Sequence, residues 1–234
     1  MRVVLPLICL ALSGCVVTTV DTTSPTAPSR TSSVAPGPSK VASRNFNSVV
    51  KRVEPVAESI CRRRTSGANC DFRILVHPDA RQPSNAYQTL DKSGVPVIVF
   101  TQALIAETQN NDELAFVLGH EAAHHIRGHI PKQQQSATAG ALLATVGASI
   151  LGAGQAGVDV AQQLGATVGA RAFSKDMELE ADSLGTVIAA RAGYDPILGA
   201  KYFDRIPDPG DQFLGSHPPN KERQKTVRRV AKGL

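Results

Sequence analysis

The sequence predicts an α+β fold, mainly helical, with one small sheet. Apolar residues recur at helical spacing over residues 46–63 and over about 112–127. Two short apolar runs, at 72–77 and 95–100, have the length and composition of strands. Few strands among many helices are typical of helices packed on one face of a small sheet. A chain of 234 residues is long enough for one well-filled core.

The N-terminal segment is predicted to lie outside this core. Arg2 precedes an apolar run that ends in the letters LSGC at 12–15, which resemble a bacterial lipobox. We expect a signal peptide at 1–14, a lipid-modified Cys15, and a Ser/Thr/Pro-rich tether over 15–44. A secreted protein cut nearby is the alternative. Val16 after the cysteine favours transfer to the outer membrane, with the domain at 45–234 facing the periplasm.

The elements of the domain follow from periodicity and turn chemistry. Residues 46–63 form the first helix, in which Pro55 is expected to cause a kink or a break. A helical stretch begins at Leu104, and the polar turn at 91–93 leaves the strand register open. Three strands are expected before that helix, at 72–77, 85–89 (a short edge strand) and 95–100.

Two cysteines remain for the mature domain, because Cys9 leaves with the signal peptide and Cys15 carries lipid. Cys61 and Cys70 are separated by a short loop. In an oxidising periplasm such a pair is expected to form a disulfide, which would tie the end of the first helix to the start of a strand. Two free thiols are the alternative.

The letters HEAAH at 120–124 are the strongest chemical signal. His120 and His124 lie four residues apart, so on a helix they face the same side and can bind one Zn²⁺ ion. Glu121 is then placed to act as a general base on a water molecule. Asn111 or Asp112 is expected to cap this helix.

A third zinc ligand is expected downstream. The pattern with a glycine three residues and a histidine six residues after His124 is absent. His125 and His129 point away from the ligand face of a continuous helix by more than a quarter turn, and are interpreted as packed or exposed side chains. Glu178 and Asp182 share a helix face, so one carboxylate can bind zinc while the other orients a histidine. Glu180 fits a solvated position.

Residues 135–157 are rich in alanine and glycine and carry no charge. The segment is only mildly hydrophobic, which argues against a membrane span. Close-packed or mobile helices beside the active site are expected, and an interfacial membrane role is the alternative.

HEAAH followed by SKDMELEADSLG and ARAGYDP resembles the HtpX and CAAX-prenyl-protease family of zinc metallopeptidases, over about residues 85–223. The small periplasmic members, such as the BepA peptidase domain, are the more similar. The resemblance implies a gluzincin-type domain binding one Zn²⁺ through His120, His124 and Glu178. It further implies Glu121 as general base and Asp182 as partner of a ligand histidine. Asn85 and Ala86 match an edge strand against which the substrate lies extended.

The resemblance also covers His217, followed by a proline, and Arg223 six residues later. In the family this histidine lies near the metal, so His217 is expected to gate activity or to stabilise an oxyanion. Arg223 would orient His217 or contact substrate. A plain loop histidine is the alternative reading of His217.

The formal net charge of +5 is modest, and the basic clusters at 62–64 and 221–232 lack interleaved aromatic residues. Nucleic acid is therefore not an expected partner. The sequence predicts a membrane-anchored zinc endopeptidase. The family resemblance implies misfolded or misassembled envelope proteins as its substrates, and an outer-membrane assembly protein or another envelope protein as a further partner. The alternative is a chaperone-like lipoprotein whose zinc site is latent and plugged by His217. A cell-wall hydrolase is disfavoured.

Overall fold

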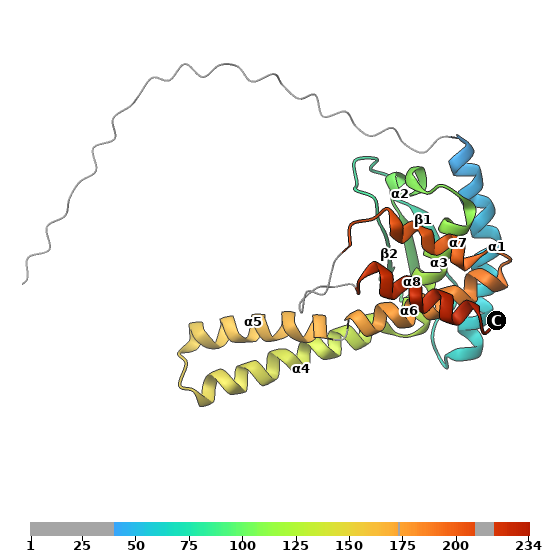
Figure 1. Cartoon of the computed structure of the whole chain (residues 1–234). Coiled ribbons are helices and arrows are strands. Elements are labelled where there is room, and N and C mark those ends of the chain that lie inside the picture. Colours follow the sequence, from blue (N-terminus) through green and yellow to red (C-terminus); the bar gives the residue numbers. More distant parts are fainter. Residues whose placement is uncertain (1–39, 173, 209–217) are drawn as a thin grey trace, which may run out of the picture. The chain divides into compact units, whose positions relative to one another are not determined.

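The computed structural model describes residues 40–172, 174–208 and 218–234, and the fold is α+β and mainly helical, as predicted (Figure 1). The elements in chain order are α1 (Lys40–Arg64), β1 (Arg73–Val76), β2 (Ala86–Leu90), β3 (Pro96–Phe100), α2 (Gln102–Glu107), α3 (Asn111–Ile126), α4 (His129–Ile150), α5 (Gln155–Ala172), α6 (Ser174–Arg191), α7 (Pro196–Gly199), the 3-10 helix η1 (Ala200–Asp204) and α8 (Asn220–Ala231).

Helix α1 is one continuous helix with Pro55 inside it, so the expected break does not occur. It begins at Lys40, five residues before the predicted start of the domain. Its apolar stripe packs into the main core. The structure joins Cys61, near the end of α1, to Cys70, which precedes β1, with the two Cα atoms 5.7 Å apart.

The sheet has the strand order β1-β3-β2. Strand β3 is buried at every position because it lies in the centre and reads Pro-Val-Ile-Val-Phe. It pairs in parallel with β1 and antiparallel with β2, so that β2 is an edge among the described strands. The Asp91 carboxylate accepts hydrogen bonds from the backbone N–H groups of Ser93 and Val95, at 2.8 and 3.0 Å. This turn fixes the register that the sequence left open.

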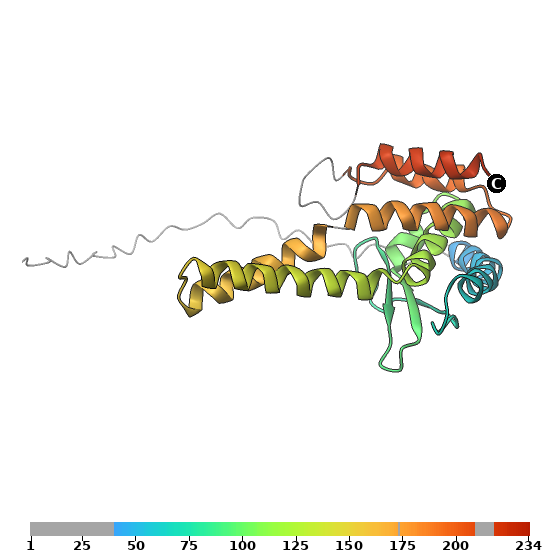
Figure 2. The same ribbon diagram turned by 90° about the horizontal axis from the view of Figure 1, so that it is seen from below.

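Helix α3 is the central element, with the sheet on one side and α6 on the other (Figure 2). The two helices approach most closely at Gly119 and Gly185. A Cβ atom at Gly119 would lie 2.9 Å from the Gly185 carbonyl oxygen, and one at Gly185 would lie 2.8 Å from the His120 nitrogen. Only glycine permits this crossing, which places α6 directly beside His120.

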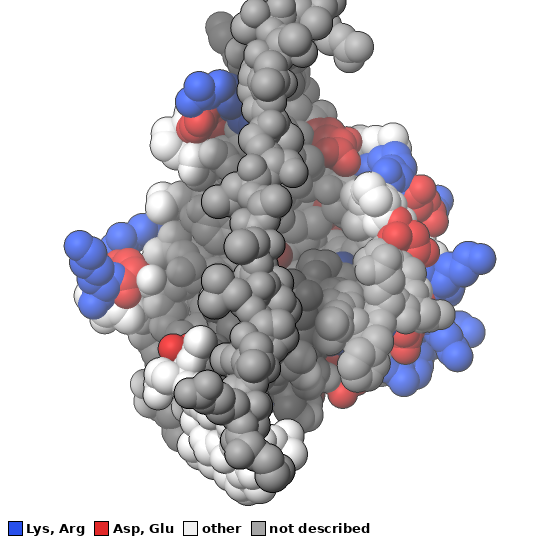
Figure 3. Space-filling view, turned by 90° about the vertical axis from the view of Figure 1, so that its left-hand side faces the viewer, with Lys and Arg blue, Asp and Glu red and all other residues white. Residues whose placement is uncertain are grey.

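Helices α4 and α5 form a hairpin that packs along its length and extends away from the sheet (Figures 1 and 2). The Ala/Gly-rich segment therefore forms close-packed helices, as predicted, but not beside the expected site, because none of residues 135–157 lines the cavity at His120 and His124. Across residues 40–172, 174–208 and 218–234, no helix has both the length and the apolar character that a membrane span requires. On the face shown in Figure 3, acidic and basic side chains of the described residues are intermingled along both flanks.

Candidate metal centre

The site is built on α3, whose start is fixed by two side chains. Asn110, rather than Asn111 or Asp112, is the N-cap, and its side chain accepts a hydrogen bond from the Glu113 N–H at 2.9 Å. Asn111 and Asp112, which were expected to cap the helix, are instead its first two residues. Glu113 is 1% exposed and pairs with Arg205 through two contacts of 2.8 and 2.6 Å. These bonds anchor α3 about two turns before His120 and about three turns before His124.

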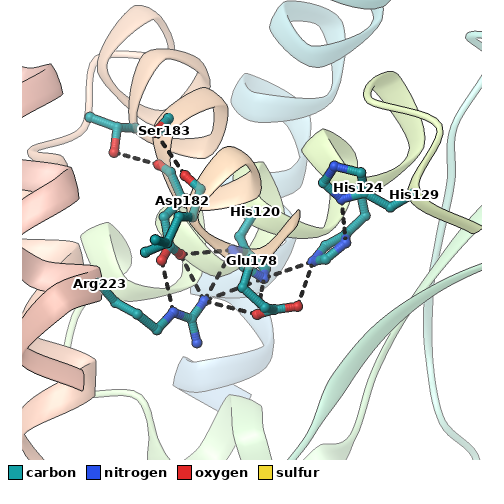
Figure 4. A network of polar contacts seen from close by, with 9 residues as sticks. His120, His124, His129, Glu178, Asp182, Ser183 and Arg223 are labelled. Carbon is teal, nitrogen blue, oxygen red and sulfur yellow. Dashed lines mark hydrogen bonds and ion pairs between the residues drawn. The ribbon is translucent and has the colours of Figure 1, made fainter. Parts of the chain in front are cut away.

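His120, His124 and Glu178 meet between α3 and α6, as predicted (Figure 4). The Nε2 atoms of the two histidines lie 3.0 Å apart. The Glu178 carboxylate oxygens lie 3.5 Å from His120 Nε2 and 3.3 Å from His124 Nε2. Helix α6 brings the carboxylate to the two rings because Gly185 lets it cross α3 closely.

The three side chains have the donor chemistry of a metal site. Ligand bonds of about 2.0–2.2 Å in a tetrahedral arrangement separate neighbouring donor atoms by roughly 3.3–3.6 Å. The separations of 3.3 and 3.5 Å, which go to the two different oxygens of Glu178, fall in that range, and the two Nε2 atoms, at 3.0 Å, lie slightly closer together. Two imidazole nitrogens and one carboxylate also leave a fourth position open. The cluster therefore fits a small tetrahedral cation with one exchangeable position.

Asp182 and Arg223 position His120 through its Nδ1 atom, on the side of the ring away from the candidate metal position. Asp182 is completely buried and lies 2.9 Å from His120 Nδ1, so it occupies the orienting position expected for it. Arg223 donates to both Asp182 oxygens, at 2.8 and 2.7 Å, and its guanidinium lies over the Phe203 ring. Burial alone would raise the pKa of Asp182, but Arg223 and His120 outweigh it and lower that pKa.

The two carboxylates beside His120 favour the protonated, positively charged form of its ring. Burial opposes the charged form of this histidine. Hydrogen bonding to Asp182 and Glu178 nevertheless raises the pKa of His120 to about 10. Without a metal, the cluster thus holds a proton where a cation would bind, and a bound cation replaces that proton.

His129 is packed, which is one of the two states predicted for it, but its side chain does not point away from the candidate ligands. Its Nδ1 atom lies 2.9 Å from His124 Nδ1, and its Nε2 atom lies 3.3 Å from a Glu180 oxygen. The prediction applied helical rotation to residue 129 although the helix was expected to end at about 127; α3 ends at Ile126, and Gly128, with φ of 65°, turns the chain into α4. Burial and His124 lower the pKa of His129 to about 4. Glu180 is therefore not a purely solvated residue either.

His125 behaves as predicted. Its Nε2 atom lies 2.7 Å from the Asn69 carbonyl oxygen, and its ring packs edge-on against Phe72. Its side chain thus serves the contact between α3 and the loop before β1, and it is no part of the metal cluster found in the described residues.

A cavity of about 620 Å³ opens over the cluster. Glu121 lines this cavity next to the three candidate ligands. Residues 84–88, which include the first three residues of the edge strand β2, line it as well. The Asn85 N–H and carbonyl groups are already bonded to Thr101, both at 2.9 Å. Because backbone groups alternate in direction along an antiparallel strand, those of Ala86 and Gln88 point away from β3. Ala86 therefore has backbone groups available to an extended chain, whereas Asn85 offers only its side chain.

Two predicted functional residues, His217 and Cys15, lie outside the described residues. Arg223 was expected to orient His217 or to contact substrate. The structure places it against Asp182, with Nη2 also 3.4 Å from a Glu178 oxygen. It lines the cavity as well.

Comparison with known proteins gives a consistent result. Peptidase family M48 matches residues 44–231 of the chain. Mitochondrial metalloendopeptidase OMA1 of Arabidopsis thaliana is 29% identical over 135 residues, which cover 56% of this chain and 27% of that protein. The beta-barrel assembly-enhancing proteases of Yersinia pestis and Escherichia coli K12 are each 31% identical, covering 47% of this chain and 24% of theirs. The chain thus spans about a quarter of the length of these curated relatives.

Proposed function

Because the chain belongs to peptidase family M48, we propose that it is a zinc-dependent endopeptidase, with His120, His124 and Glu178 as the metal ligands. The observation that carries the proposal is the convergence of these donors, within 4.8 Å of one another, on the floor of a cavity that the edge strand β2 borders. When bound there, zinc supplies Lewis-acid polarisation of a peptide carbonyl and of water.

The residues of the chain supply the remaining chemistry. Glu121 takes a proton from the attacking water and returns it to the leaving amine. Asp182, held by Arg223, accepts from His120 Nδ1 and keeps the Nε2 lone pair directed at the metal. An extended peptide adds as a strand to β2, bonding to the backbone of Ala86 and Gln88 while the Asn85 side chain lies beside it. We assign His217 to gating or to oxyanion stabilisation, as the sequence suggests.

Substrate and location belong to the same proposal. Two of the relatives are named as beta-barrel assembly-enhancing proteases, which supports misfolded or misassembled envelope proteins as the substrate class. The signal peptide, the lipid on Cys15 and the tether would attach the enzyme to the outer membrane, on its periplasmic side. Fractionation of cell envelopes checks this attachment, which a Cys15→Ser variant should lose.

The Glu121→Gln variant of the full chain tests the activity. Zinc content should remain at about one per chain, because Glu121 is no ligand. Cleavage of an unfolded protein such as casein should fall by roughly 10²–10⁴-fold, because the proton acceptor is lost. Glu222→Gln on α8, whose side chain is exposed beside the buried Arg223, is the matched control and should cleave like the unaltered chain.

Two results would contradict the proposal. Absence of zinc from the purified chain would remove the metal site. Zinc binding with no cleavage by the unaltered chain, and no difference in Glu121→Gln, would favour the chaperone-like alternative with a latent site. Loss of cleavage in Glu121→Gln alone, with zinc retained, supports the peptidase.

A further inference from the structure

A second chain of side-chain contacts starts at His124, whose ring contacts that of His129 (Figure 4). His124 turns its Nε2 atom towards His120 and Glu178, and its Nδ1 atom towards His129. His129 is 4% exposed, and its far nitrogen contacts Glu180, whose side chain is 48% exposed. Each ring nitrogen of both histidines therefore has a defined neighbour.

The positions of the ring protons follow from these contacts. A carboxylate can only accept, so the Nε2 atom of His129 carries the proton that it donates to Glu180. Only one proton fits between two Nδ1 atoms 2.9 Å apart. A His124 that binds metal through Nε2 carries its proton on Nδ1 and donates it to His129. The protons thus point in one direction, from His124 through His129 to Glu180.

The chain path makes this contact possible. In a continuous helix, residues 124 and 129 would lie about 140° apart around the axis and would face different sides. Helix α3 ends at Ile126, and Gly128 has φ of 65°, a conformation that side chains rarely adopt. His129 then starts α4 facing back towards His124.

We propose that His129, supported by Glu180, is a positioning residue that holds the His124 ring and its tautomer for metal binding. The inference rests on the proposed function, because it takes His124 as a ligand. It gives each ligand histidine its own support. The Asp182–Arg223 pair, buried and charged, holds His120, and the neutral imidazole of His129 holds His124. Histidine ligands commonly donate their outer N–H to a carboxylate, a carbonyl or a water molecule, and losing that acceptor weakens metal binding by about 10–100-fold. Here the acceptor is the Nδ1 atom of His129.

Zinc affinity of the full chain, measured by competition with a chromophoric chelator, tests the inference. His129→Ala should weaken Zn²⁺ binding by about 10–100-fold. His129→Asn should retain most of the affinity, because its amide oxygen can replace Nδ1 as the acceptor. Glu180→Ala should have a smaller effect than His129→Ala, because Glu180 acts through His129. His125→Ala is the matched control and should bind zinc normally. His125 follows His124 at the end of α3, but its ring contacts the Asn69 carbonyl oxygen instead of a candidate ligand.

The absorption spectrum of the Co²⁺-substituted protein gives a second readout, because its visible bands report ligand geometry. The spectrum should change in His129→Ala and remain unchanged in His125→Ala. Equal zinc affinity in these two variants would overturn the inference. Equal weakening in His129→Ala and His129→Asn would also overturn it, because the hydrogen bond would then not matter. Failure of the unaltered chain to bind zinc, or zinc retention by His124→Ala, would instead defeat the proposed ligand set.

Discussion

Two arginines hold the helices around the site by pairing with buried carboxylates, and only Arg223 is itself buried, whereas Arg205 is exposed. Arg223 on α8 pairs with Asp182 on α6, which in turn contacts His120. Arg205, after η1, pairs with Glu113 near the start of α3. Each carboxylate is almost completely removed from water. Removing either arginine leaves a buried charge without its main partner, which is more costly than the pair itself is stabilising.

Substituting each arginine should therefore distinguish an effect on the stability of the fold from an effect on zinc affinity. Arg223→Ala is expected to lower the free energy of unfolding of the metal-free protein by about 3–5 kcal/mol, because Asp182 stays buried. It should also weaken zinc binding, since His120 loses its fixed partner. Arg205→Ala should lower stability as well, although the Gln109 N–H still donates to Glu113. Zinc affinity should not change in Arg205→Ala.

Urea unfolding and zinc titration of the two variants are the measurements. The assignment of Arg223 to the metal site would be refuted by an equal loss of zinc affinity in both variants, because Arg205 contacts none of the three candidate ligands.

At the residue scale, helical periodicity was sufficient to predict part of the site. The pairs His120–His124 and Glu178–Asp182 follow from four-residue spacing, and each spacing lies within one helix. The choice of Glu178 as the ligand rested on the family resemblance as well. The contact of His129 was missed because it depends on the direction that the chain takes at Gly128 after α3, and a glycine in a single sequence indicates a turn without giving its direction. The crossing at Gly119 and Gly185 was missed as well, because it is a contact between two helices.

At the scale of elements, the α4–α5 hairpin has an unusual distribution of side chains. Its interface consists of small residues, and a Cβ atom at Gly140 would lie 2.2 Å from the Gly165 carbonyl oxygen. The larger apolar side chains instead lie on the exposed outside, at Leu142, Leu143, Ile150, Leu151, Val160 and Leu164. The hairpin is therefore held by close backbone approach rather than by interlocking large side chains.

Two glycines of α4 should respond in opposite ways to substitution by alanine. Gly140→Ala is expected to force the helices apart and to destabilise the hairpin by about 1–3 kcal/mol. Gly147→Ala meets no atom within 4 Å, and should stabilise α4 by up to about 1 kcal/mol through helix propensity. Amide hydrogen exchange over residues 129–172 measures both effects. Exchange in Gly140→Ala as slow as in the unaltered chain would show that the close approach is not needed.

The composition of residues 135–157 predicted close-packed helices but could not fix the ends of the hairpin. Alanine and glycine carry little periodic signal, so nothing in the segment marks the turn at 151–154 or the start of α4 at His129. Strands β1 and β3 were predicted within a few residues because their apolar runs are bounded by polar turns, and the edge strand β2 was expected between them without such a run. Their register depended on the side chain of Asp91, which an apolar pattern does not report.

At the scale of the whole domain, the candidate ligands come from two helices that the hairpin separates along the chain. His120 and His124 lie on α3, and Glu178 lies on α6, after α4 and α5. A bound metal therefore closes a long loop between α3 and α6. In the metal-free protein, the glycine crossing and the pairs around Asp182 hold these helices together.

Metal binding should consequently stabilise the fold as a whole. At a free zinc concentration of about 1,000 times Kd, the free energy of unfolding should rise by about 4 kcal/mol, because the unfolded chain does not assemble the site. A chelator should reverse the gain. His124→Ala should lose it, whereas Glu222→Gln, altered at an exposed position of α8, should keep it. Urea unfolding with and without zinc measures the difference. A similar gain in His124→Ala would mean that the stabilising zinc binds elsewhere, and that α3 and α6 are not joined by the proposed site.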